Sequence, residues 1–216
     1  CADRTSQVLK IGLISPFSGA LEDLGAGSVE GAHLAFMDFL SDGRVNVQGQ
    51  GQGPTVSLIK KDCSNSPEQA VRAAQQLIKQ EHVVAIIGPP LSDLAIPVAG
   101  VCEGAGVAMI TQIATNQRVT EGKKCVFRVC YTDAFQGAAI ARFSREGLSA
   151  TTAAMLYDEA NDFSRTIAGI FARVFEEAGG SIVADTRYTS DNRGVSDQLA
   201  RIAESDDQPV ERRALA

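Results

Sequence analysis

The segment from Val8 to Leu40, VLKIGLISPFSGALEDLGAGSVEGAHLAFMDFL, decides the fold class of this chain. It opens with an apolar, β-branched run over residues 8–14. Further along, apolar residues recur at helical spacing on one face, namely Ala32, Ala35, Phe36, Phe39 and Leu40. A strand followed by an amphipathic helix is the repeating unit of parallel α/β folds. We therefore expect a strand over 8–14, a loop over 15–27 and a helix over 29–40.

The same alternation continues along the chain. Further strands are predicted at 56–60, 83–87, 107–110 and 126–129, and helices at 68–80, 92–103 and 134–146. The run VVAII at 83–87 is continuously apolar, which is typical of a strand covered on both faces. These elements predict a five-stranded, flavodoxin-like parallel layer.

A second α/β unit is expected after this layer. Its pattern predicts strands at 152–157 and 181–187 and helices at 163–178 and 195–204, with Gly179-Gly180 ending the first helix. The tail, SDDQPVERRALA, is polar where another buried strand would be needed. Two strands do not close a sheet layer by themselves. Either this unit packs onto something else, or the chain is a fragment of a longer protein, and the pattern favours the fragment.

Composition excludes some classes of partner. Hydrophobic residues make up 44% and charged residues 21% of the 216 residues, as in ordinary globular proteins. The net charge is −6 and no run of Lys or Arg occurs, which argues against a nucleic acid or an anionic membrane surface as partner. No stretch approaches the ~20 apolar residues of a spanning helix.

The cysteines indicate an oxidising compartment. The chain begins at Cys1 rather than Met, which resembles a processed bacterial lipoprotein whose N-terminal cysteine carries lipid, with residues 1–7 as a tether. Four more cysteines suit secretion, namely Cys63, Cys102, Cys125 and Cys130. No pair has CxxC spacing, and His33 and His82 lie far away in sequence, so we expect no metal site.

No catalytic pattern is evident. Gly25, Gly27 and Gly31 give only GxGxxxG, separated from the first strand by a loop, whereas a dinucleotide fingerprint follows the strand directly. A GxSxG elbow is absent, and neither histidine has an evident nucleophile partner. We expect neither an enzyme nor a cofactor.

Six segments, taken in order, carry a resemblance to a known family. They are IGLISPFSGALEDLGAGSVEGAHLAF, KKDCSNSPEQAVRAAQQLI, IIGPPLSDLAIPVAG, AMITQIATNQRVT, FRVCYTDAFQG and AMLYDEANDFSRTIA. Together they resemble the periplasmic leucine/isoleucine/valine-binding protein family, which has the type I periplasmic-binding-protein fold. That family has two α/β lobes joined by hinge strands, with ligand held between them.

The resemblance implies a division of the chain. Residues 8–133 would form lobe one, 134–150 the crossover and 151–204 the start of lobe two, before a polar tail at 205–216.

Three loops of the first layer leave strands at the edge where ligands bind in open α/β sheets, at 15–27, 88–92 and 111–116. The last two run into predicted helix starts, where free N–H groups and the helix dipole favour an anion. Ser92 fits an N-cap of one helix, and Thr115 and Asn116 fit the cap of the other.

The resemblance assigns roles to these positions. Ser92 and Thr115 would hold an amino acid's α-carboxylate, and the backbone from Ile113 through Ala114 to Thr115 part of its ammonium. Taken alone, Ser92 and Thr115 are also explained as ordinary helix caps. The residue that pairs with the ammonium would lie beyond the end of the chain.

The side chain of the ligand would meet other residues. Leu24 stands where the family often has an aromatic residue, and Phe163 where it often has tyrosine, so an apolar ligand side chain is expected. Phe163 is equally explained as a core residue. Ser18 of the first loop completes the predicted site.

The family's lobe-one disulfide is altered here. Cys63 is present, but its expected partner region, residues 88–91, has no cysteine. Cys102 and Cys125 are a possible substitute pair, and a bridge of that loop length would stabilise by roughly 3 kcal/mol. We expect no bond between Cys63 and Cys130.

The functional expectation is an extracytoplasmic solute-binding component of an ABC transporter, exported by a signal peptide and lipid-anchored at a bacterial membrane. It would capture an amino acid by hinge closure and dock on a permease. Two alternatives stay open, a sensory receptor module of the same fold and a truncated relative that does not bind.

Overall fold

The computed structural model describes residues 8–43, 46–47, 55–189 and 195–206. Cys1, the predicted tether at 1–7 and nearly all of the predicted tail lie outside these residues. The chain divides into two compact units, Cys1–Cys130 and Tyr131–Ala216, and each is treated by itself.

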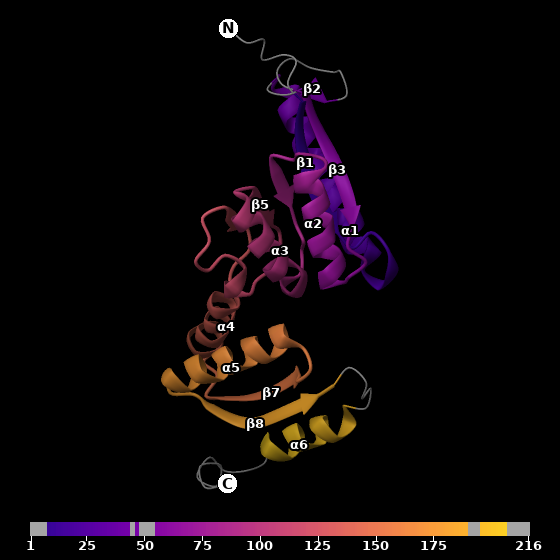
Figure 1. Cartoon of the computed structure of the whole chain (residues 1–216). Helices are drawn as coiled ribbons and strands as arrows, with labels where there is room; N and C mark the ends of the chain where they lie inside the picture. The colour runs from indigo at the N-terminus through magenta and orange to yellow at the C-terminus, as the bar shows by residue number, and fades with distance from the viewer. Residues whose placement is uncertain (1–7, 44–45, 48–54, 190–194, 207–216) are drawn as a thin grey trace. The chain divides into compact units, whose positions relative to one another are not determined.

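A parallel sheet forms the first unit. Its described strands run in the order β2-β3-β1-β4-β5-β6. Figure 1 labels β1, β2, β3 and β5 of this sheet. Their bounds are β1 Val8–Ser15, β2 Asn46–Val47, β3 Thr55–Asp62, β4 Ala85–Ile87, β5 Ala108–Thr111 and β6 Val126–Arg128. The five predicted strands are confirmed. The two-residue strand β2 was not predicted, because it lies beside a stretch rich in Gly and Gln without an apolar run.

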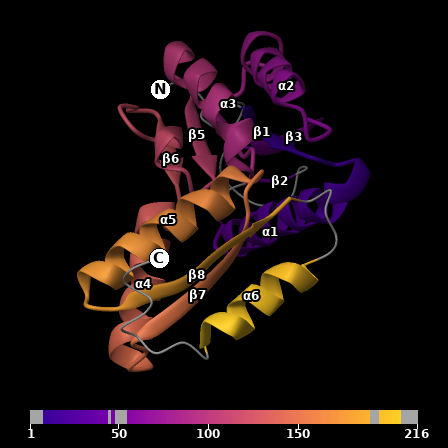
Figure 2. The same cartoon turned by 90° about the horizontal axis from the view of Figure 1, so that it is seen from below.

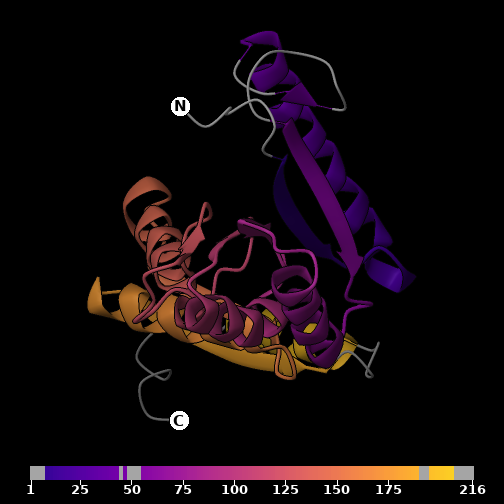
Figure 3. The ribbon, with the colours of Figure 1, turned by 45° about the horizontal axis from the view of Figure 1, so that its top comes forward.

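The central ladder sets the register of the sheet. β1 pairs with β3 from Val8 opposite Thr55 to Ser15 opposite Asp62. Figure 3 shows these two long strands, in indigo and purple, side by side. β4 pairs with β1 on its other side and with β5 beyond. The carboxyl ends of β1, β4 and β5 therefore meet at one edge of the sheet.

Helices cover both faces of this sheet. They are α1 (Glu22–Ser41), α2 (Pro67–Lys79) and α3 (Ser92–Ala105), with short 3₁₀ turns η2 (Gly19–Leu21) and η3 (Gln117–Val119). α2 and α3 pack side by side, and α1 lies on the opposite face (Figure 2). The largest fully buried side chains of the core under α2 and α3 are Ile14, Leu77, Ile86, Leu94, Val98, Met109 and Val119.

Helix α1 begins seven residues earlier than predicted, at Glu22. Glu22 and Asp23 occupy its first turn, where carboxylates interact favourably with the helix dipole. The predicted loop is therefore shortened to the residues before Glu22. The predicted apolar face is also partly wrong, because Ala32 is buried whereas Ala35 and Phe39 are exposed.

The described part of the second unit, 131–189 and 195–206, contains one parallel strand pair with three helices. Its elements are α4 (Asp133–Arg142), a π-helical turn η4 (Phe143–Gly147), β7 (Thr152–Asp158), α5 (Asp162–Glu177), β8 (Ser181–Tyr188) and α6 (Ser196–Asp206). α4 packs against α5, and α6 against β8. As predicted, α5 ends at the glycine pair, whose N–H groups donate to the Glu176 and Phe175 carbonyls at 2.9 Å each.

Arg145 joins the turns at one end of this unit. Its Nε donates to the Ala178 carbonyl at 3.1 Å, and its Nη1 donates to the Ala150 carbonyl. Its guanidinium also lies 5.7 Å from the centroid of the Phe175 ring.

No helix in the described ranges is both long and apolar enough to span a bilayer.

Candidate functional site

The exits of β4 and β5 are joined by two hydrogen bonds. The Gly88 N–H donates to the Ile110 carbonyl at 2.8 Å, and the Thr111 hydroxyl donates to the Pro89 carbonyl at 2.6 Å. Thr111 is fully buried, so this second bond is shielded from water. The two loops that follow these strands consequently start from fixed positions.

Ser92 links the two loops. It is the first residue of α3 rather than its N-cap, which is Leu91. The predicted cap role is thus wrong by one position, because the backbone at Leu91 is the last in extended conformation. The Ser92 Oγ instead accepts a hydrogen bond from the Asn116 N–H at 3.2 Å.

Of the two residues predicted to cap the turn after β5, Thr115 and Asn116, the structure gives Asn116 this role. Asn116 caps the short turn η3, because its side chain accepts from the Arg118 N–H at 3.0 Å. Thr115 precedes it and is half-buried, as is Ser92. Neither side chain is sealed in the core, and the Ser92–Asn116 bond holds the two segments together.

Two predicted site residues share a groove, although Ile113 was expected to act through its backbone and not through its side chain. Leu24 of α1 and Ile113 line a groove of about 230 Å³, together with Asp23, Gly27, Ser28, Pro90 and Gln112. Ile113 is 48% exposed, whereas Ala114 beside it is fully buried. The structure therefore presents Leu24 and Ile113 to one ligand-sized space and packs Ala114 into the core.

Ser18 is held in a different cluster. Its hydroxyl donates to the Asp62 Oδ2 at 2.6 Å and lies 3.3 Å from the Ser64 hydroxyl. The Phe17 N–H donates to the other oxygen of Asp62 at 2.9 Å. Partial desolvation raises the pKa of Asp62, but these hydrogen bonds lower it more, to about 2. Ser18 thus anchors the first loop, and the groove lining does not include it.

Asp62 was missed by sequence reasoning. A carboxylate at the end of an apolar strand was the available signal. Its partners Phe17 and Ser18 could not be read from the sequence, because they lie on a loop more than 40 residues away.

Arg128 was also missed. Its Nη1 donates to the Ala114 carbonyl at 2.9 Å. Its Nη2 donates to the carbonyls of Asn116 and Gln117 at 2.9 and 3.1 Å, and to the Thr120 hydroxyl at 2.8 Å. A lone arginine closing the apolar strand β6 was the available signal.

Phe163 lies in the second unit, at the start of α5. It is 49% exposed and lines a groove of about 310 Å³ with neighbours that include Ile140, Tyr157 and Phe171. Asn161 caps α5 by accepting from the Ser164 N–H at 2.9 Å. Phe163 therefore has a defined place beside an apolar surface of its own unit.

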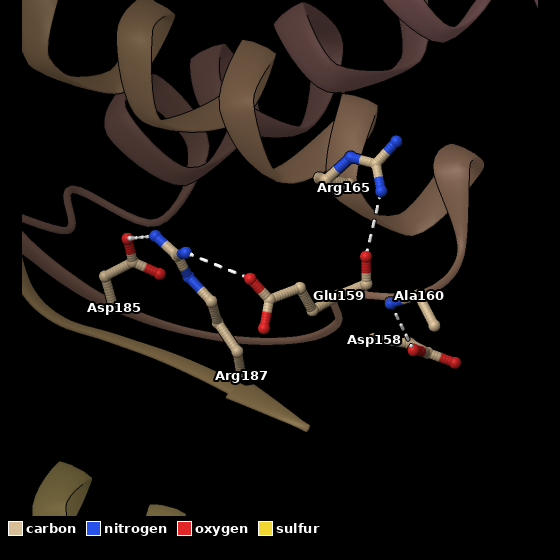
Figure 4. Close-up of polar contacts among 6 residues, drawn as sticks. All are labelled: Asp158, Glu159, Ala160, Arg165, Asp185 and Arg187. Atoms are coloured by element: carbon tan, nitrogen blue, oxygen red, sulfur yellow. Dashed lines mark hydrogen bonds and ion pairs between the residues drawn. The ribbon is translucent and has the colours of Figure 1, made fainter. Parts of the chain in front are cut away.

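Charged contacts hold the loop that leads to α5 (Figure 4). Arg187 lies 3.3 Å from the Glu159 carboxylate and 3.2 Å from that of Asp185. Arg165 donates to the Glu159 carbonyl at 2.9 Å. Because these side chains are about half exposed, each pair stabilises only slightly, and together they set the path of the loop.

The predicted bridge between Cys102 and Cys125 is not formed. Cys63, Cys102, Cys125 and Cys130 are all free thiols in the described chain. Cys102 is fully buried among the core residues of α3, and burial, together with the nearby Cys125 thiol, raises its pKa to about 12. Cys125 is held instead through its N–H, which donates to the Glu103 carboxylate at 2.9 Å.

This chain is similar to a known protein family and to several known proteins. The family model described as periplasmic binding protein matches residues 8–208. An amino acid binding protein of Pseudomonas aeruginosa is 33% identical over 69% of this chain and 38% of its own length.

Solved structures show the same architecture. The leucine binding protein LivK of Thermotoga maritima matches with a TM-score of 0.75 and 31% identity, over 92% of this chain and 54% of that one. The branched-chain amino acid substrate binding protein LivJ of Streptococcus pneumoniae, solved with isoleucine, matches with a TM-score of 0.75 and 27% identity, over 91% and 54%. The chain thus spans about half the length of these structures.

Proposed function

Since this chain belongs to the periplasmic binding protein family, we propose that it forms the first ligand-holding part of an extracytoplasmic solute-binding component of an ABC transporter. Its ligand is an apolar amino acid of the branched-chain type. The observation that carries this proposal is the hydrogen bond from the Asn116 N–H to the Ser92 Oγ, which joins two strand-exit loops beside an apolar groove.

The carboxylate of the ligand would bind at the start of α3. The first N–H groups of a helix have no partner within it, and the dipole of this 14-residue helix favours an anion there. The Ser92 hydroxyl accepts from Asn116, so its own hydrogen is available for a carboxylate oxygen. Thr115 supplies a second hydroxyl and an N–H on the adjoining loop.

The side chain of the ligand would enter the groove beside Leu24 and Ile113. A space of about 230 Å³ accommodates an aliphatic side chain of the leucine type. Burying such a side chain against apolar walls is favourable, whereas burying a charged one is costly.

The second lobe would complete the site by closing over the bound amino acid, with Phe163 on its wall. The closed protein would deliver the ligand to a membrane permease, and lipid at Cys1 would keep it near that membrane. Because the contacts of two lobes contribute to affinity, the 216-residue chain should bind leucine only weakly, with a Kd of roughly millimolar.

A titration followed by amide chemical shifts tests this proposal. The ¹⁵N-labelled chain is titrated with L-leucine, L-isoleucine, L-phenylalanine and L-aspartate. We expect leucine and isoleucine to shift the amide signals of Ser92 and Thr115, and aspartate to shift them less. Ser92→Ala should weaken leucine binding about tenfold, since a hydrogen bond to a charged group is lost.

The matched control is Ser41→Ala, which removes an exposed hydroxyl whose hydrogen bond is to the Asp38 carbonyl. It should leave the leucine titration unchanged. The proposal fails if leucine leaves the Ser92 and Thr115 amides unshifted at concentrations well above millimolar.

A further inference from the structure

The loop that carries Thr115 is held by hydrogen bonds from one guanidinium, that of Arg128. We propose that Arg128 is a positioning residue that aims the Thr115 N–H at the carboxylate of the ligand. This inference rests on the proposed function, since it assigns a role to a residue that supports the same site.

The geometry begins at the last residue of β6. Arg128 pairs with Thr111 of β5, and its side chain reaches the loop that leaves β5. There it donates four hydrogen bonds of 2.8–3.1 Å, three of them to backbone carbonyls. One planar group thus fixes the carbonyls of Ala114, Asn116 and Gln117.

The orientation of these carbonyls decides where the N–H groups point. In a trans peptide unit the C=O and the following N–H point in opposite directions. Because the Ala114 carbonyl faces Arg128, the Thr115 N–H faces away from the guanidinium. Within the described chain this N–H has no hydrogen-bond partner, so it is available to a ligand.

The neighbouring amide shows which way the loop faces. The next N–H along, that of Asn116, donates to the Ser92 Oγ. The loop pinned by Arg128 is therefore in direct contact with the start of α3. A carboxylate at that helix start would have the Thr115 N–H as a further donor.

The charge of Arg128 adds to this effect. No carboxylate in the described part of the chain lies within ion-pair distance of its guanidinium. A cation bonded to a carbonyl polarises that peptide and strengthens the donor at its other end. The arginine thus makes the loop a better anion site without touching the anion.

The experiment compares two probes that differ at the carboxyl group, L-leucine and L-leucinamide. Titrations followed by ¹⁵N–¹H spectra are run on the native chain, Arg128→Met and Arg128→Lys. Arg118→Met is the matched control, since Arg118 lies on the same loop and is exposed. We expect the native chain to prefer leucine, with the Thr115 amide shifting more for leucine than for leucinamide.

Arg128→Met should lower the preference for leucine over leucinamide about tenfold and abolish the Thr115 shift. Arg128→Lys retains the positive charge but not the planar, forked set of N–H donors. Its preference for leucine over leucinamide should therefore lie between that of the native chain and that of Arg128→Met. If Arg128 only supported the fold, its replacement would weaken the binding of leucine and leucinamide equally. A folded Arg128→Met chain with an unchanged preference overturns the inference.

The native chain provides a test that does not depend on a variant that folds. If leucine shifts the Ser92 amide but not the Thr115 amide, the inference is wrong while the proposed function stands. If leucine shifts neither, both are wrong.

Discussion

Ser18 and Asp62, at the exits of two neighbouring strands, are joined by a hydrogen bond of 2.6 Å from the serine hydroxyl to the Oδ2 of the carboxylate. The same carboxylate accepts from the Phe17 and Ser64 N–H groups at 2.9 and 2.8 Å. Asp62 therefore fixes the path of the loop between β1 and α1, which leads to the groove residue Leu24.

Asp62→Asn should destabilise the chain at neutral pH. The folded pKa of about 2 lies below the ordinary value of 3.8, so the ionised carboxylate stabilises the fold above about pH 4 and this contribution is lost as the pH falls toward 2. Since the carboxylate is largely exposed, we expect a loss of only about 1 kcal/mol near pH 7. Urea unfolding followed by circular dichroism at several pH values measures it.

The difference in unfolding free energy between native chain and variant should shrink between about pH 4 and pH 2. Glu30→Gln, at an exposed position of α1, is the control and should show no comparable change. A difference that stays constant across this range would contradict the assignment.

Gly88→Ala should strongly destabilise the first unit. Gly88 has φ +83°, and a Cβ there would lie 2.2 Å from the Ile14 carbonyl oxygen. Backbone strain and overlap together should cost roughly 2–4 kcal/mol. Chemical unfolding measures the loss. The control is Gly104→Ala in α3, where a Cβ meets nothing within 4 Å, and it should be neutral or stabilising. Equal effects of the two changes on the free energy of unfolding would refute the strain and overlap inferred at Gly88.

Gly137→Ala tests the packing of α4 on α5 in the second unit. A Cβ at Gly137 would lie 2.7 Å from the Ile170 Cγ2 and 3.2 Å from the Ile167 carbonyl oxygen. Separating the helices should lower the free energy of unfolding by roughly 1–3 kcal/mol. Gly169→Ala lies in open space on α5 and should raise it by up to about 1 kcal/mol. If Gly137→Ala proves as stable as the native chain, the close helix contact is wrong.

Cys102 should resist alkylation while the chain is folded. Its pKa of about 12 leaves little thiolate near neutrality, and its side chain is fully buried. At about pH 8 its reaction with iodoacetamide should be at least roughly a thousandfold slower than that of an exposed thiol. Peptide mass spectrometry before and after unfolding in urea measures the labelling. The half-buried Cys125 and Cys130 are the internal comparison, and labelling of Cys102 at their rate would contradict its burial.

Local pattern accounts for most of what could be predicted of the fold. The strands β1, β3, β4, β5 and β6 were found because apolar runs have a short-range signature. Errors fall where that signature is weak. The predicted start of α1 is too late, since Gly25 and Gly27 interrupt the helical pattern. The predicted N-cap of α3 is also one residue off, because Leu91 is the N-cap and Ser92 is the first helical residue.

The candidate site was only partly predictable. The positions of Ser92, Ile113 and Thr115 followed from strand ends and from the family resemblance. The hydrogen bond of Ser18 to Asp62 and that of Arg128 to Ala114 did not, because the two partners of each bond lie on different segments of the chain. A side chain at a strand end can reach several loops, and its position in the sequence does not tell which of these loops it contacts.

The amino-acid sequence by itself determined the alternation of strands and helices and the loops that leave the parallel strands, because periodic burial of apolar side chains is a local property of the chain. Only the tertiary structure decided that Ser18 bonds to Asp62 and that Arg128 holds the carbonyl of Ala114. The reason is that β3 lies beside β1 and β6 beside β5 once the sheet is assembled, and this order brings each donor within reach of its acceptor.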